Sequence, residues 1–81
     1  IKKIMLIKVL FFGVLAEVTQ TSIKHYRDVR SFSDLRLRIE DDYPELVHYN
    51  YRIAVNNEII NKDPVLNDND EVAFMPPFAG G

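Results

Sequence analysis

The chain of 81 residues contains no cysteine and no tryptophan. Without cysteine it can form no disulfide bond and no thiolate zinc site, and it has no cysteine nucleophile. The absence of cysteine also removes the usual indicator of redox compartment. Any chemistry that this chain carries must therefore use other groups.

Neither sign of charge dominates. Ten lysine and arginine residues stand against 12 aspartate and glutamate residues, giving a formal net charge of -2, and the basic residues are spread along the chain. Binding to a nucleic-acid backbone requires a basic patch. We therefore expect no nucleic-acid partner.

Long apolar runs are also missing. The longest nearly apolar stretch, "VLFFGVLA", runs from Val9 to Ala16, whereas about 20 residues are needed to span a bilayer. The N-terminus has no signal-peptide layout, so we expect a cytoplasmic protein without a membrane partner. Because the chain opens on Ile1, either Met5 is the natural start and residues 1–4 are an extension, or further residues precede those given.

What is present is an ordinary globular balance, with 47% hydrophobic and 27% charged residues. A chain of this length makes one domain and buries only about 60% of its unfolded surface, so its core is modest. We do not expect it to enclose an active site alone.

The first half of the chain changes its apolar period once. Residues 5–12 ("MLIKVLFF") and 21–29 ("TSIKHYRDV") read as two antiparallel strands, joined by a turn in "GVLAEVTQ". The period then becomes helical, with Leu35, Ile39 and Tyr43 on one stripe. We predict a helix from about Phe32 to Asp42, with Ser31 or Ser33 as its N-cap.

The second half returns to strands. "YRIAVNNEII" predicts a strand followed by a turn at Asn56 and Asn57, since asparagine tolerates positive φ. "EVAFM" (71–75) predicts a final strand beside the first. This order gives an α+β domain, a mixed sheet packed on one main helix, with the C-terminus leaving from a sheet edge.

The alternation along the strands divides the sheet into two faces. The residues expected to face the helix are Ile7, Val9, Ile53, Val55, Val72 and Phe74. The residues left on the opposite face are Leu10, Phe12, Ala54, Ala73 and Met75. A clustered apolar surface of this kind usually marks a binding site, although loops that cover it would be the alternative.

Other polar features favour ordinary structural roles. His25 and His48 have no ligand spacing, so we expect no metal site. The acidic stretch Glu40–Glu45 reads as a solvated helix end. The stretch Asn67–Glu71 ("NDNDE") lacks the glycine and distal glutamate of a calcium loop and reads as a turn.

The chain ends in "PPFAGG". Pro76 and Pro77 have fixed φ and favour an extended path, which lowers the cost of ordering the segment in a partner. Gly80 and Gly81 have no side chain and fit a narrow channel. We therefore predict a flexible tail over 76–81, attached to a single domain that spans the chain.

Two stretches, "VLFFGVLAEVT" and "DNDEVAFMPPFAGG", carry a resemblance to the ThiS/MoaD family of sulfur carriers, and within it to the small subunits of molybdopterin synthase. The resemblance covers nearly the whole chain and implies the ubiquitin-like β-grasp fold. Two positions depart from the family pattern. Phe78 stands where a smaller apolar residue is usual, and Asn69 stands where glycine is common.

The resemblance also implies a function. An E1-like activating enzyme would adenylate the Gly81 carboxylate with ATP, and sulfur would then replace the adenylate to give a thiocarboxylate. Residues Pro76, Pro77, Phe78, Ala79 and Gly80 would thread the partner. The large subunit, in an expected heterotetramer, would use this sulfur on a cyclic pyranopterin precursor of the molybdenum cofactor. The chain would be a carrier without catalytic groups, cofactor or metal of its own.

Three alternatives remain open from the sequence. The sulfur carrier of thiamine biosynthesis uses the same terminal chemistry, although the long "GVLAEVTQTS" connection and the "AFMPPF" run argue against it. A ubiquitin-like modifier would instead join its terminal glycine to a lysine. The third alternative is a β-grasp binding module with an inert tail.

Overall fold

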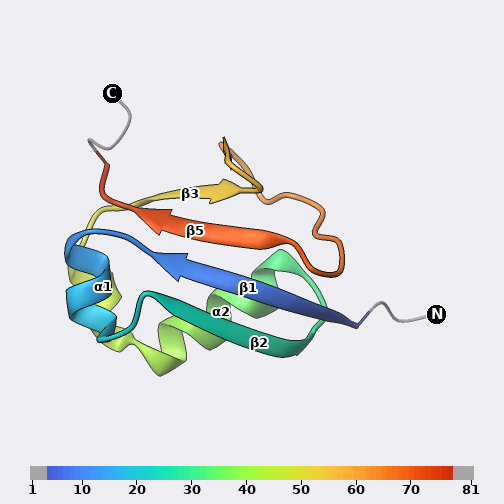
Figure 1. The fold of residues 1–81 in the computed structure, drawn as a ribbon, viewed down its shortest axis with the longest axis horizontal. Helices are drawn as coiled ribbons and strands as arrows, with labels where there is room; N and C mark the ends of the chain where they lie inside the picture. Colours follow the sequence, from blue (N-terminus) through green and yellow to red (C-terminus); the bar gives the residue numbers. More distant parts are fainter. Residues whose placement is uncertain (1–3, 78–81) are drawn as a thin grey trace.

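The computed structural model of the chain describes residues 4–77. The described residues form one five-stranded sheet with the strand order β2-β1-β5-β3-β4 (Figure 1). In chain order the elements are β1 (Met5–Phe11), α1 (Val14–Thr19), β2 (Ile23–Val29), α2 (Phe32–Asp42), η1 (Pro44–His48), β3 (Arg52–Val55), β4 (Glu58–Ile59) and β5 (Glu71–Met75). The predicted α+β class and mixed sheet are confirmed, since β1 pairs antiparallel with β2 and parallel with β5.

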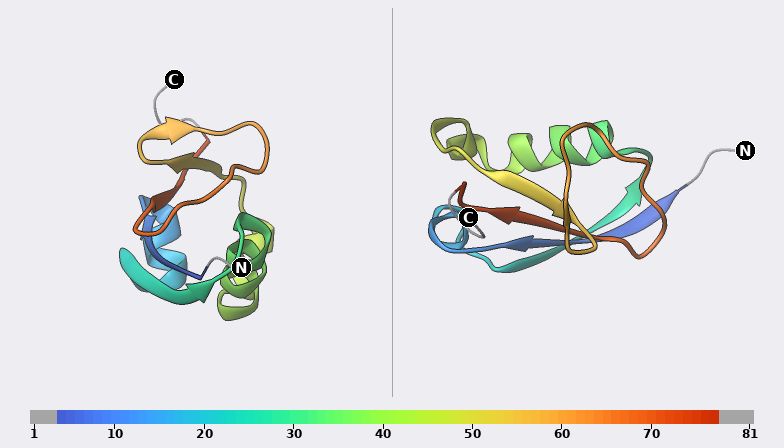
Figure 2. Two further views of the ribbon diagram at one scale, coloured as in Figure 1. Left: turned by 90° about the vertical axis from the view of Figure 1, so that its right-hand side faces the viewer. Right: turned by 90° about the horizontal axis from the view of Figure 1, so that it is seen from above.

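Helix α2 lies along one face of the sheet (Figure 2). Its predicted bounds are confirmed, and the side chain of Ser31 caps it by accepting a hydrogen bond of 3.0 Å from the Asp34 backbone N–H. The core between helix and sheet includes Ile7, Val9, Val72 and Phe74 from the strands and Leu35 and Ile39 from α2. The inward face is therefore as predicted, although Val55 is only half-buried.

One predicted turn is wrong. The "GVLAEVTQ" stretch contains the six-residue helix α1, which buries Leu15 and Thr19. The hydroxyl of Thr19 donates a hydrogen bond of 2.9 Å to the Leu15 carbonyl, and Gln20 ends the helix in the left-handed conformation with φ 58°. A helix this short is marginal by itself and depends on tertiary packing. Because it makes fewer than two turns, its sequence is too short to show a repeating helical pattern of apolar residues.

The place of the last strand also differs from the prediction. Strand β5 does lie beside β1, but it is the central strand of the sheet, with β3 paired on its other side. The chain after β5 thus leaves from the end of a central strand and not from a sheet edge. This position holds the residues of β5 between two paired neighbours.

Asparagine residues make the tight turns. Asn56 and Asn57, with φ of 49° and 71°, form the predicted turn between β3 and β4. Asn69 has φ 68°, which explains why this position accepts glycine or asparagine but strains most other residues. Asp70 is buried behind this turn, where its carboxylate accepts hydrogen bonds from the Asn56 side chain and the Asn67 backbone.

Candidate functional site at the end of the central strand

The predicted tail begins inside the packed domain. Pro76 is buried and Pro77 is exposed, so Pro76 belongs to the domain, one residue past the boundary that the sequence suggested. Phe78, Ala79, Gly80 and Gly81 lie outside the described residues. The structure thus places the base of the predicted tail and leaves the roles of those four residues as predictions.

The junction between β1 and α1 packs against this base. The Phe12 backbone N–H donates a hydrogen bond of 3.0 Å to the Phe74 carbonyl. At Gly13, which has φ 56°, a Cβ atom would lie 3.0 Å from Cγ of Pro76. In Figure 1 the end of β5 and helix α1 lie at the same end of the molecule, and β1 starts at the opposite end. Sequence patterns could not reveal this contact because the two segments lie far apart in the chain.

An apolar row crosses the outer face of the sheet, the face away from α2. Cross-strand pairing places five apolar residues in line from edge to edge. These residues are Ile23, Leu10, Ala73, Ala54 and Ile59. We call this set the outer row. Ile23 and Ile59 were missed by sequence reasoning because membership depends on which strands pair.

The residues predicted for this face differ in exposure. Phe12 is 47% exposed, and Leu10, Ala73 and Met75 are half-buried. The prediction of an exposed side chain at Ala54 is wrong, because Ala54 is only 3% exposed. Its single methyl group lies between two paired strands and does not protrude beyond its neighbours. Among these residues and the outer row, the most exposed apolar side chains are therefore Phe12, Ile23 and Ile59.

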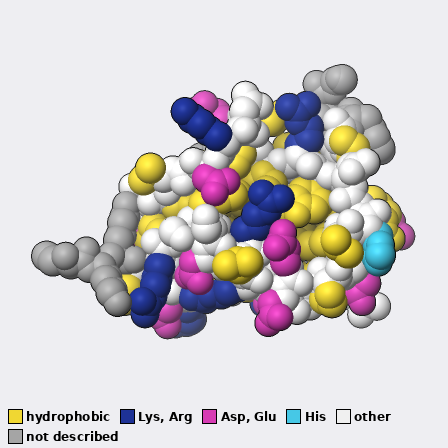
Figure 3. All heavy atoms as spheres, turned by 180° about the vertical axis from the view of Figure 1, so that it is seen from behind, with side chains coloured by type: hydrophobic (Ala, Val, Ile, Leu, Met, Phe, Trp, Pro, Cys, Tyr) yellow, Lys and Arg dark blue, Asp and Glu magenta, His cyan; other side chains and the backbone are white. Residues whose placement is uncertain are grey.

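Polar residues border the outer row. Lys8 pairs with His25 on β2 and with Glu71 on β5, and its ammonium lies 3.7 Å from the Glu71 carboxylate. The face on the α2 side differs, since acidic, basic and apolar side chains are interspersed there (Figure 3). The outer face thus presents an apolar strip with a charged margin, an arrangement typical of protein interfaces.

Among the described residues, the other polar stretches lie in turns and at a helix end. Within residues 4–77 no three histidine, aspartate or glutamate side chains gather as metal ligands. The predicted turn in Asn67–Glu71 is confirmed by the left-handed Asn69. The solvated helix end at Glu40–Glu45 is only partly correct, because the Asp42 carboxylate accepts hydrogen bonds from Tyr26 (2.7 Å) and Lys24 (3.2 Å).

The arrangement of strands and helices identifies the class of protein to which the chain belongs. The fold is the ubiquitin-like β-grasp, and it matches solved structures at low sequence identity. The small archaeal modifier protein 1 from Methanosarcina acetivorans superposes with a TM-score of 0.78 at 23% identity, over 96% of this chain and 98% of that one. A chain in the protein-protein complex of subunits 1 and 2 of molybdopterin-converting factor from Helicobacter pylori 26695 also matches, with a TM-score of 0.72 at 24% identity, over 95% of this chain and 100% of that one.

Sequence comparison identifies the family. The model described as the ThiS family matches residues 9–81. The molybdopterin synthase sulfur carrier subunit of Mycobacterium tuberculosis (strain ATCC 25618 / H37Rv) is 35% identical over 80 residues, which covers 93% of this chain and 96% of that protein. The chain therefore belongs to the ThiS family, and the resemblance noted from its sequence is confirmed. No helix among residues 4–77 is both long and apolar enough to cross a membrane.

Proposed function

We propose that the chain is the sulfur carrier subunit of a molybdopterin synthase and that it acts through the carboxylate of Gly81. The observation that carries the proposal is the 35% identity to a curated carrier subunit over almost the full length of both proteins. Gly80 and Gly81, with Pro76 and Pro77 before them in the tail, supply the thin, stiff segment that the chemistry requires.

The proposed chemistry has two steps. An oxygen of the Gly81 carboxylate attacks the α-phosphorus of ATP on an E1-like activating enzyme, and pyrophosphate leaves. A sulfide-level sulfur nucleophile then attacks the carbonyl carbon, and AMP leaves with the bonding electrons. The product is a thiocarboxylate, which donates its sulfur to a cyclic pyranopterin on the large subunit. The carrier's own residues present and direct the tail, and the acids and bases belong to its partners.

The large subunit is the proposed partner of the outer face. Support comes from the Helicobacter pylori structure, whose subunits 1 and 2 form a protein-protein complex, and from the exposed side chains of Phe12 and Ile23. We assign two carriers and two large subunits to the assembly. Docking of the outer face would hold Pro76 close to the partner while the last residues enter its active site.

The test is ATP–pyrophosphate exchange with purified activating enzyme. Gly80→Val should fold as the unmodified chain does and fail to support exchange, because a side chain blocks a narrow channel. One residue added after Gly81 should also fail, since it shifts the carboxylate by about 3.3–3.6 Å while reacting atoms must lie about 3–3.5 Å apart.

Circular dichroism provides the control for folding in both variants. Full exchange from the extended chain, with no trimming visible by mass spectrometry, would contradict the proposal. Reconstitution with the large subunit and the cyclic precursor then separates molybdopterin synthesis from the thiamine alternative.

A further inference from the structure

Among the described residues, strand β2 is one edge of the sheet, because it pairs with β1 alone. The Phe11 N–H donates a hydrogen bond to the Ser22 carbonyl, so the alternation of an antiparallel pair turns the backbone groups of Ile23, His25 and Arg27 away from β1. An edge of this kind is a template for pairing with another extended chain. The outward carbonyls of β2 therefore need either water or a covering group.

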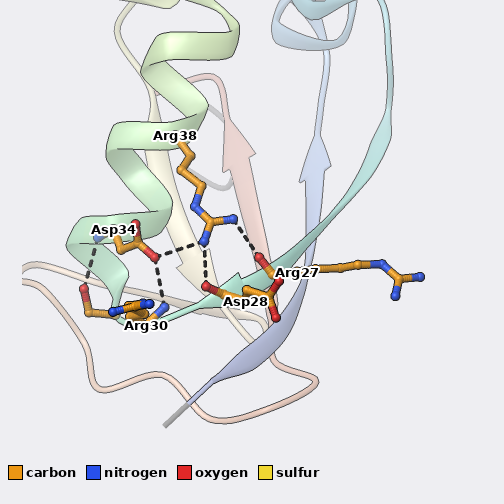
Figure 4. Close-up of polar contacts among 6 residues, drawn as sticks. Arg27, Asp28, Arg30, Asp34 and Arg38 are labelled. Carbon is orange, nitrogen blue, oxygen red and sulfur yellow. Dashed lines mark hydrogen bonds and ion pairs between the residues drawn. The ribbon is translucent and has the colours of Figure 1, made fainter. Parts of the chain in front are cut away.

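Side-chain donors of the same chain cover both ends of this edge. At the start of β2, the Thr21 hydroxyl donates a hydrogen bond of 2.8 Å to the Ile23 carbonyl. At its end, the Arg38 guanidinium donates hydrogen bonds of 2.6 Å each to the carbonyls of Arg27 and Asp28 (Figure 4). Among the described residues, His25 is left as the uncovered outward position in the middle.

Local geometry holds Arg38 in this position. Its guanidinium also lies 3.3 Å from the carboxylate of Asp34, one turn earlier on α2. The Arg30 backbone N–H donates to the same carboxylate at 2.9 Å, and this bond holds the pKa of Asp34 below its usual value. Asp28 has φ 57° within a shift of the β1–β2 register, a bulge that brings two successive carbonyls within reach of one guanidinium.

We propose that Arg38 and Thr21 block the free edge of β2 and so prevent it from pairing with the β2 of a second copy of this chain. The occupant is a second copy because the same edge on both molecules is self-complementary in an antiparallel pair, as two-fold association requires. With this edge blocked, the carrier does not pair with itself through β2. The inference is independent of the sulfur chemistry.

The test compares Arg38→Met/Thr21→Val with the unmodified chain by sedimentation equilibrium from about 10 µM to about 1 mM. Methionine keeps an apolar stem and valine keeps the shape of threonine, so both changes remove donors with little change in packing. The unmodified chain should stay at its monomer mass of 9.4 kDa. The double variant should self-associate at least about tenfold more tightly, as expected when charge-assisted hydrogen bonds no longer occupy the edge.

Two further variants identify the surface. Adding His25→Pro should restore the monomer, because it removes an outward N–H and costs β2 none of its bonds to β1. Arg36→Met is the matched control, since Arg36 lies on the same helix and pairs with Glu40 at 3.3 Å. It should leave the association unchanged.

A folded double variant that stays monomeric over the whole range would overturn the proposal, and so would association that His25→Pro leaves intact. Should Arg38→Met fail to fold, Thr21→Val with Arg38→Lys replaces it, because one ammonium cannot reach both carbonyls. This second variant must show the same His25-dependent association for the proposal to stand.

Discussion

Tyr26 and Asp42 join β2 to the end of α2 through one hydrogen bond. The Tyr26 hydroxyl donates to the Asp42 carboxylate at 2.7 Å, and Lys24 lies 3.2 Å from the same oxygen. The bond from Tyr26, followed by that from Lys24, holds the pKa of Asp42 below its ordinary value of 3.8. This hydrogen bond links β2 to the end of α2, two segments that are distant in the sequence.

The sign of this shift predicts how stability depends on pH. The folded chain holds the Asp42 proton less tightly than the unfolded chain, so the stabilisation is complete above pH 3.8 and is lost as the pH falls through the lower folded pKa. Tyr26→Phe should cost about 1 kcal/mol at neutral pH. Urea denaturation should show this difference narrowing below pH 3.8, and a difference that grows in acid would contradict the account.

Asp28 is a second residue whose conformation makes a prediction. Its φ of 57° is a left-handed conformation inside a strand, which a β-branched residue adopts only with strain. Asp28→Val should lower the free energy of unfolding by about 1–2 kcal/mol. Asp28→Gly should cost less, and equal losses from the two variants in denaturant unfolding would show that the bulge does not fix this conformation.

The elements that sequence patterns predict well are those whose signal is local. Helix α2 has a helical apolar stripe, a serine cap and a proline that follows, so its bounds were predictable. Strand alternation also predicted the inward face. Helix α1 was missed because six residues hold no full pattern, and its stability comes from packing Leu15 into the core.

Contacts between distant elements were not predictable. The central place of β5 and the outer row both depend on which strands pair, and local periodicity holds no information about pairing. The same reason hid the burial of Ala54, the approach of Gly13 to Pro76 and the reach of Arg38 to β2. The resemblance to a known family supplied the proposed function, which local patterns alone could not indicate.

Phe12, the residue directly after β1, carries its own prediction. Phe12→Glu should leave the melting temperature almost unchanged, because the ring is 47% exposed. It should weaken binding to the large subunit by about 2 kcal/mol, as expected for an aromatic anchor that becomes buried in an interface. Isothermal titration calorimetry beside thermal melting separates the two effects.

Leu37→Glu is the matched control for this prediction. Leu37 lies on α2 and is 67% exposed. Its replacement by glutamate introduces the same charge on the α2 side of the molecule. Equal losses of affinity from Phe12→Glu and Leu37→Glu would show that charge, and not the outer face, determines binding.

In the proposed function, the molecule as a whole directs one end toward a partner. The central strand β5, helix α1 and the base of the tail meet at the same end (Figure 1), and α2 lies along the face opposite the outer row (Figure 2). In the described part of this domain, no three histidine, aspartate or glutamate side chains gather as metal ligands. Its proposed contribution is a precisely directed C-terminal glycine.

The mass of the chain isolated from cells that make molybdopterin tests this account most directly. Exchange of one carboxylate oxygen for sulfur adds about 16 Da, and fragmentation should place the added mass on Gly81. The account predicts this species in wild-type cells and its loss when the activating enzyme is absent. A chain that never carries the added mass, or that is found joined through Gly81 to lysines of other proteins, would contradict the sulfur-carrier function.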